Sequence, residues 1–319
     1  SLTYVPDDNF EQALIDLGYD DVLDDYVVTD SINSVTTLNV SNDSISDLTG
    51  IEDFTGLTTL FCSNNALTAL DISSNTALIN FDCGYNSLTS LDVSSNTALT
   101  GLGCYSNELT SLDVSNNTAL IALQLQSNSL TSLDISSNIA LDHLTVQNNQ
   151  LTSLDVSNNT ALIHLNISDN NLDSLDVSTN TDLSFLSCAY NDLTVLDVSN
   201  NTALTRLDCY HNDLTNLDVT NNVNLTRLNT YGNALDTLDV SNNVDLTYLS
   251  CVGLQSSNLD VYNNIALSTL ICHTSQLTSL DVSNNTDLTY LNCRANQLDS
   301  LDVSNNTVLT DLRCQSNGL

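Results

Sequence analysis

From Cys62 onward the chain repeats every 21 residues, and this period is the strongest constraint on its fold. A period near 20 residues is typical of a solenoid, in which each repeat forms one coil and stacked coils share a continuous core. Residue types that stay fixed from coil to coil are therefore expected to build the stack. Positions that vary on an outward face are free to recognise another molecule.

The fixed positions include two prominent columns. Nine cysteines share one phase of the period: Cys62, Cys83, Cys104, Cys188, Cys209, Cys251, Cys272, Cys293 and Cys314. Twelve aspartates, called the aspartate column below, share another: Asp71, Asp92, Asp113, Asp134, Asp155, Asp176, Asp197, Asp218, Asp239, Asp260, Asp281 and Asp302.

Residues 1–34 lie outside the repeat and are expected to form an N-terminal cap. Within them, Pro6 to Gly18 combines acidic residues at its start, apolar residues at three- and four-residue spacing and a final glycine, which predicts a short helix. Residues 35–319 are expected to form one solenoid of about 13–14 coils. Because Leu319 falls partway through a coil, we expect a longer parent chain with further domains.

The repeat resembles a known family. Residues 88–108 contain Leu-x-x-Leu-Asp-Val-x-x-Asn followed by Leu-x-Cys-x-x-Asn, which is similar to the nested 21-residue class of bacterial secreted leucine-rich repeats. The longer coil at 45–66 resembles the internalin type. The resemblance implies a mainly β fold, a right-handed solenoid of stacked parallel strands, and a function in binding rather than catalysis.

The charge of the chain narrows its possible partners. Its 39 acidic residues, four arginines and no lysine give a formal net charge of −35 at pH 7. Such a body repels nucleic acid, so we expect no nucleic-acid partner. No apolar run approaches the length of a membrane span, which argues against direct membrane insertion. The composition favours an extracellular or bacterial cell-surface location.

The cysteine phase predicts a ladder of buried free thiols. Other coils carry Leu125, Val146, Ile167 or Thr230 at this phase, so the position accepts small or medium side chains and needs no disulfide. A metal site is the weaker reading, because no CxxC motif occurs. Two asparagine columns, which include Asn86 and Asn107 in one and Asn75 and Asn96 in the other, are expected to bond the backbone at the corners of the coil.

The aspartate column is expected on a second strand-like segment of each coil, such as Leu91 to Val93, in which the leucine and valine point inward and Asp92 outward. Its like charges require compensation. Strands stacked about 4.8 Å apart would place like charges close together, at a cost of about 1 kcal/mol for each exposed pair. Serine hydroxyls beside each aspartate, such as Ser90 and Ser94 around Asp92, would relieve this by donating hydrogen bonds. Calcium bridging the carboxylates is the alternative. We expect hydroxyl bonding and no cofactor, with calcium kept open.

The remaining chemical variety gathers on one strand face, called the variable face. Its expected ligand-binding residues are Tyr85, Tyr105, His143, His164, Phe185, Tyr190, Arg206, Tyr210, His211, Arg227, Tyr231, Tyr248, Tyr290 and Arg294. Clusters of exposed aromatic residues and arginine are typical of recognition surfaces. The alternative is that residues on this face vary without a binding function and that Arg206 and Arg227 pair with Asp208.

Three functions follow from these patterns. The first is a secreted or cell-surface adhesion module that binds a protein or an acidic polysaccharide through the variable face. The alternative is a rigid acidic spacer in a larger surface protein, stabilised by salt or calcium. An enzyme is disfavoured, because the carboxylates repeat in identical settings and no nucleophile lies beside a base.

Overall fold

Each coil contributes one three-residue strand centred on a buried apolar side chain. In β11 (Arg206–Asp208) the central Leu207 is fully buried, whereas Arg206 on the outer side of the strand is exposed. This alternation follows from the two-residue period of an extended chain. The repeat therefore sends one set of side chains into the core and presents a second set on the outer face.

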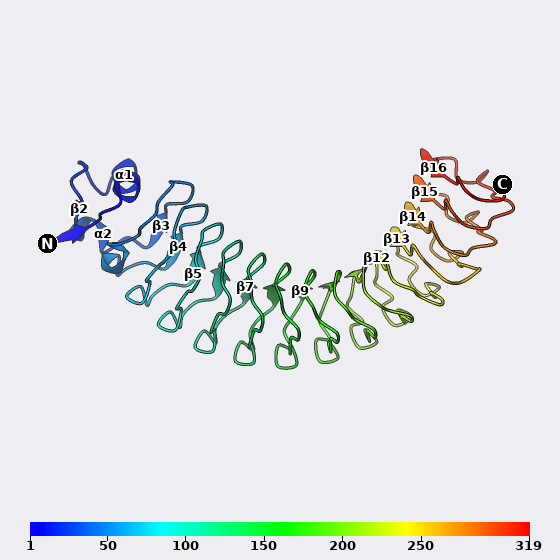
Figure 1. Ribbon diagram of the computed structural model, residues 1–319, viewed down its shortest axis with the longest axis horizontal. Helices are drawn as coiled ribbons and strands as arrows, with labels where there is room; N and C mark the ends of the chain where they lie inside the picture. The colour runs from blue at the N-terminus through cyan, green and yellow to red at the C-terminus, as the bar shows by residue number, and fades with distance from the viewer. The chain divides into compact units, whose positions relative to one another are not determined.

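The structure is a computed structural model that describes residues 1–319 as two units, Ser1–Asn159 (unit 1) and Thr160–Leu319 (unit 2). Unit 1 holds the parallel strands β3 (Thr37–Asn39), β4 (Thr59–Phe61), β5 (Asn80–Asp82), β6 (Gly101–Gly103), β7 (Ala122–Gln124) and β8 (His143–Thr145), several of which are labelled in Figure 1. Their register advances by one repeat at each step from β4 onward, so equivalent positions lie side by side.

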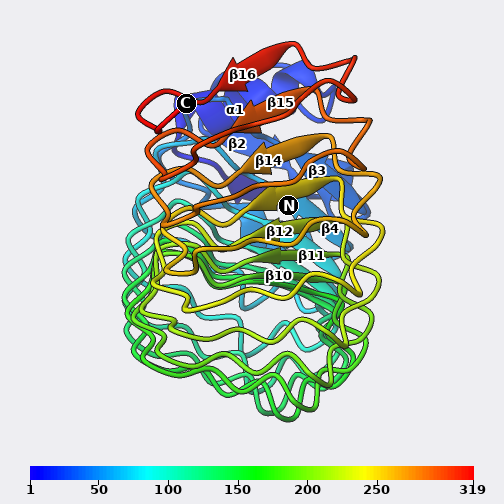
Figure 2. The ribbon, with the colours of Figure 1, turned by 90° about the vertical axis from the view of Figure 1, so that its right-hand side faces the viewer.

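Unit 2 repeats the same arrangement. Its strands are β9 (His164–Asn166), β10 (Phe185–Ser187), β11, β12 (Arg227–Asn229), β13 (Tyr248–Ser250), β14 (Thr269–Ile271), β15 (Tyr290–Asn292) and β16 (Asp311–Arg313). All neighbouring pairs are parallel, and Figure 2 shows β10, β11 and β12 stacked with their arrows in one direction. The predicted parallel-stranded solenoid is confirmed.

The predicted N-terminal helix is present as α1 (Asp8–Asp16). Asp7 caps it by accepting hydrogen bonds from the amides of Asn9 and Phe10 at 3.0 Å, and Gly18 follows it with a φ of 81°. The second carboxylate oxygen of Asp7 accepts the amide and hydroxyl of Ser46. Asp7 thus caps the N-terminus of the helix and also connects the helix to the first coils.

Other elements near the N-terminus were not predicted from the sequence. β1 (Leu2–Tyr4) pairs antiparallel with β2 (Tyr26–Val28), and α2 (Thr29–Ile32) follows directly. A short 3₁₀ helix, η1 (Ile51–Asp53), lies in the longer coil. The domain boundary at residue 34 stays a prediction, although the first parallel strand, β3, begins shortly after it.

The cysteine phase forms a ladder of free thiols. Eight of the nine side chains are buried and Cys314 is partly exposed. Burial raises the pKa of Cys188 and of Cys251 to about 12, so these thiols stay protonated and behave as small apolar side chains. The prediction of a buried, unbridged ladder is confirmed.

The asparagine columns hold the turns together. Asn212 donates from Nδ2 to the carbonyls of Cys188 and Cys209 at 3.0 Å, and its Oδ1 accepts the amide of Leu193 at 3.0 Å. In the other column, Asn201 donates to the carbonyls of Val177 and Asn180. The expected structural role of both columns is confirmed, because the amides of Asn212 and Asn201 each link their own coil to the preceding one.

The second half of the coil differs from expectation. Leu91 and Val93 point inward and Asp92 outward as predicted, but the structure assigns no strand to this segment. The amide of Ser94 donates to the Asp92 carboxylate at 2.8 Å, within the same coil. This short turn replaces the ladder bond that a second sheet would need.

Candidate functional site

The variable face comes from three positions in each coil. The first strand residue supplies His143, His164, Phe185, Arg206, Arg227, Tyr248 and Tyr290 on β8 to β13 and β15. The second residue after the strand supplies Tyr105, Tyr210, Tyr231, His273 and Arg294, and the residue after that supplies Tyr85, Tyr190 and His211. Because paired strands are parallel and in register, equivalent side chains form rows in which neighbours are about 4.8 Å apart.

In unit 2 the first row forms a stack of rings and guanidinium groups. His164 and Phe185 are stacked with ring centroids 4.1 Å apart and an interplanar angle of 4°. The guanidinium carbon of Arg206 lies 5.0 Å from the centroid of Phe185, and that of Arg227 lies 3.8 Å from the centroid of Tyr248. Cation–π contacts of this kind fix the arginine side chains on the face.

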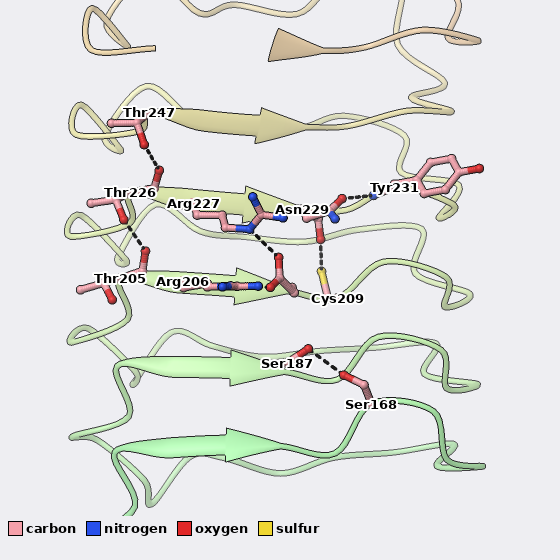
Figure 3. Close-up of polar contacts among 11 residues, drawn as sticks. Ser168, Ser187, Thr205, Arg206, Cys209, Thr226, Arg227, Asn229, Tyr231 and Thr247 are labelled. Atoms are coloured by element: carbon pink, nitrogen blue, oxygen red, sulfur yellow. Dashed lines mark hydrogen bonds and ion pairs between the residues drawn. The ribbon is translucent and has the colours of Figure 1, made fainter. Parts of the chain in front are cut away.

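Asp208 joins the two halves of this row. Its carboxylate accepts the Nε of Arg206 at 2.6 Å and the Nε of Arg227 at 3.2 Å, and its side chain is only 2% exposed. Figure 3 shows Arg206 and Arg227 on adjacent strands. The pairing of both arginines with Asp208, which the sequence analysis gave as the alternative for this face, is therefore present.

A second row lies beside the first. Tyr190 stacks on His211 with centroids 4.5 Å apart, and His211 meets Tyr231 edge-on at 4.7 Å. Tyr210 contacts both Tyr190 and His211 by its edge, and Tyr231 lies 6.4 Å from His273. Unit 2 therefore brings together most of the side chains that the sequence analysis proposed.

Two residues of the second row have an unfavourable backbone conformation. Tyr190 and His211 each have a φ of 52°, in the left-handed region that bulky residues rarely adopt. Other coils place Asn148, Asp169 or Gly232 at the same turn position. Ser106 and Ala295 have the same positive φ in their coils, so this conformation belongs to the repeat and does not by itself mark a functional site.

Unit 1 carries a smaller set. Tyr85, also in the left-handed region with a φ of 51°, meets Tyr105 edge-on at 5.4 Å. The hydroxyl of Tyr105 donates to Asp82 at 3.0 Å, and burial together with this carboxylate raises the pKa of Tyr105 to about 12. His143, the first residue of β8, contacts Asp142 at 2.7 Å.

The proposed residues of the last coils are more scattered. Tyr290 lies 5.2 Å from the guanidinium of Arg313, which is paired with Asp311. Arg294 is exposed on the same side of the coil. Sequence reasoning left Asp82 out of the site and named Asp208 only as an alternative partner of the two arginines. Asp82 and Asp208 are each the third residue of a strand, and this shared position in the repeat could have placed both on the variable face.

The ionised carboxylates of the aspartate column are stabilised mainly by hydrogen bonds. The carboxylate of Asp218 accepts both the amide and the hydroxyl of Thr220, at 2.9 and 2.6 Å. At Asp92, the hydroxyl and amide of Ser94 lower the pKa of the carboxyl, and they outweigh repulsion from Asp71 and Asp113. The bonds come from the residue two positions later, not from Ser90. No group of three or more His, Cys, Asp or Glu is arranged to hold a metal ion, and calcium binding stays a prediction.

We predict that acid destabilises the chain through this column. The pKa of Asp92, Asp113 and Asp176 is lowered in the folded chain, so ionised carboxylates stabilise it above the unfolded pKa of about 3.9. That contribution is lost as the pH falls through the lowered folded values. The urea midpoint, followed by circular dichroism, should therefore decrease between about pH 4 and pH 2. A midpoint that rises throughout this range would show that relief of charge repulsion dominates instead.

Comparison with known proteins agrees with this architecture. No family model matches the chain. Internalin J of Listeria monocytogenes serotype 4b (strain F2365) is 40% identical over 73 residues, which span 23% of this chain and 8% of that protein. No helix of the chain has the length and hydropathy needed to cross a membrane.

Two solved structures extend the likeness to the whole chain. The internalin InlF of Listeria monocytogenes matches with a TM-score of 0.88 at 25% identity, over 99% of this chain and 96% of that one. The functional domain of InlJ from Listeria monocytogenes, described as including a cysteine ladder, matches with a TM-score of 0.85 at 37% identity. That match covers 98% of this chain and 76% of the InlJ domain. The chain therefore belongs to the internalin family of leucine-rich repeat proteins.

Proposed function

We propose that this chain is a secreted or cell-surface module that binds a protein partner through the variable face of unit 2. The observation that carries the proposal is the stack of His164, Phe185 and Arg206 beside the pair of Arg227 and Tyr248. These side chains lie on the outer side of the sheet and do not belong to the buried apolar core. Arginine and tyrosine are among the residues that contribute most to protein interfaces.

Charge favours a protein over an acidic polysaccharide. Asp208 offsets one of the two positive charges that the row would offer to an anion. The net charge of −35 also repels a polyanion at long range. A protein surface that contributes aromatic and apolar side chains would use the rings without meeting this repulsion.

The second row provides a clean test of the proposal. The test variant carries Tyr190→Gly, His211→Gly and Tyr231→Ser together. Glycine tolerates the left-handed conformation, so the rings are removed without strain. Capture from a protein extract should lose its retained partner, with an affinity at least about 10-fold weaker. The urea midpoint should stay close to that of the unmodified chain.

Tyr262→Ser is the matched control. Tyr262 is 59% exposed and follows the aspartate column, where most coils carry serine or threonine. The control should retain the partner as well as the unmodified chain does. Equal capture by the triple variant and the control would contradict the proposal, and binding of an acidic glycan array instead of protein would redirect it to a polysaccharide.

A structural spacer is the second candidate function. The repeated bonds of the aspartate column, such as Ser115 to Asp113 and Ser136 to Asp134, favour a uniform, acid-rich body independent of any partner. This function predicts no specific capture by either face, with stability that depends mainly on salt or calcium.

A further inference from the structure

Unit 1 contains a hollow on its variable face, over β5, β6 and β7. Its volume is about 190 Å³, and its lining includes Phe61, Asp82, Gly101, Gly103 and Gln124. Neither glycine has a positive φ, so the backbone does not require glycine at either position. A Cβ on Gly101 would lie 2.8 Å from Oδ1 of Asn80 and would meet no other group, so only the flexible Asn80 side chain covers this position.

Asp82 in this hollow is the counterpart of Asp208 in unit 2. Both are the third residue of their strands. Asp208 is paired with Arg206, two residues earlier, and with Arg227, which lies opposite Arg206 on the next strand. At Asp82 the two corresponding positions hold Asn80 and Gly101, which face each other across β5 and β6.

The Asp82 carboxylate therefore has no cation from its own chain. None of the four ion pairs in the structure includes it. One oxygen accepts the amide of Gly84 at 2.9 Å and the other accepts the Tyr105 hydroxyl at 3.0 Å. A carboxylate offers about four acceptor sites, so about two are left for a further donor.

We infer that this hollow binds an arginine side chain of a protein partner, which takes the place that Arg206 and Arg227 occupy at Asp208. A volume of about 190 Å³ is below the range of about 300–1,000 Å³ typical of small-molecule pockets, and suits one long side chain. A guanidinium matches a carboxylate in two-point geometry, and Phe61 and Tyr105 add aromatic surface beside it. The net charge of −35 would draw a basic segment toward it.

The inference does not depend on the face of unit 2, and its test addresses unit 1 alone. The full chain, labelled with ¹³C on tyrosine, is titrated with N-acetyl-arginine amide at constant ionic strength. The ring signals of Tyr105, assigned with Tyr105→Phe, should shift with a dissociation constant on the order of 10 mM. N-acetyl-citrulline amide, which is neutral but of the same shape, should bind at least about 10-fold more weakly.

Two variants examine the site directly. Asp82→Asn keeps an acceptor for the Gly84 amide and lets its Nδ2 donate to the Tyr105 hydroxyl, which can also accept. It removes the charge and should weaken arginine binding by about 10-fold or more. Gly101→Arg supplies the equivalent of Arg227 and should abolish binding by filling the hollow. Asp113→Asn, on the aspartate column of the same unit, should change nothing.

Several results of these titrations would contradict the inference that the hollow binds an arginine side chain. No saturable shift up to about 100 mM probe would overturn the inference. Equal binding of citrulline, or binding unaffected by Asp82→Asn, would also overturn it. N-acetyl-lysine amide binding as tightly as the arginine probe would remove the assignment to a guanidinium group.

Discussion

Replacing Asn212 by alanine is expected to lower the free energy of unfolding by about 3–5 kcal/mol. Asn212 is 6% exposed and makes three strong hydrogen bonds between two coils. Each bond contributes about 1 kcal/mol, and the Leu193 amide would lose its acceptor in a buried position, at a further cost of about 1–3 kcal/mol. The carbonyls of Cys188 and Cys209 each keep a second asparagine donor, which limits the loss.

Asn200→Ala is the matched control for this prediction. Asn200 is exposed and makes one bond, to the carbonyl of Ser178 at 3.2 Å. Its loss should change the free energy of unfolding by no more than about 0.5 kcal/mol. Urea unfolding of the two variants measures the difference, and hydrogen exchange at the Leu193 amide should speed up only in Asn212→Ala. Equal stability of the two variants would show that the asparagine column does not hold the coils together.

The second large effect is expected at the arginine pair. Arg206→Ala and Arg227→Ala each leave Asp208 one cation, so each should cost about 1 kcal/mol. The double variant leaves a nearly buried carboxylate with no cation, and should cost about 3 kcal/mol. This figure is below that of a fully buried pair because both arginines are partly exposed. The double effect should therefore exceed the sum of the single effects.

A third substitution separates charge from packing. Asp208→Asn in the double-variant background removes the unpaired charge, and asparagine already occupies this position at Asn229 and Asn292. We expect it to recover most of the stability lost in the double variant, as measured by urea unfolding. If the single effects are additive and Asp208→Asn recovers nothing, the ion pair does not stabilise the face. The result also matters for binding tests, because arginine variants would confuse lost affinity with lost stability.

The fold was predictable because the repeat is periodic. A fixed phase for leucine, cysteine and asparagine determines which side chains point inward, and Asp7 with Gly18 gives the ends of α1. The pairing of β1 with β2 was not predictable, because each strand has only three residues and they lie far apart in the sequence. The expected strand at Leu91 to Val93 is absent because Ser94 donates to Asp92 rather than to a neighbouring coil.

The candidate site was predictable only in part. The position of each residue in the repeat shows which side chains lie on the variable face. It does not show which of them form ion pairs or ring contacts, because these depend on side-chain geometry. The pairing of Arg206 and Arg227 with Asp208 could be given from the sequence only as an alternative, and the side-chain geometry of the structure decides for it. The left-handed conformation of Tyr190 was likewise hidden, because glycine marks that conformation in only some coils.

Site-specific photo-crosslinking tests the binding proposal most directly. A benzophenone amino acid is placed at Tyr231 on the variable face of unit 2, or at Tyr262 beside the aspartate column, and each chain is illuminated in a protein extract. Tyr231 is 40% exposed and Tyr262 is 59% exposed, so the control position is at least as accessible to solvent as the tested one. The proposal predicts covalent adducts with a defined partner protein from position 231 and none from position 262. Adducts from position 262 alone, or from neither position, would contradict the assignment of recognition to this face.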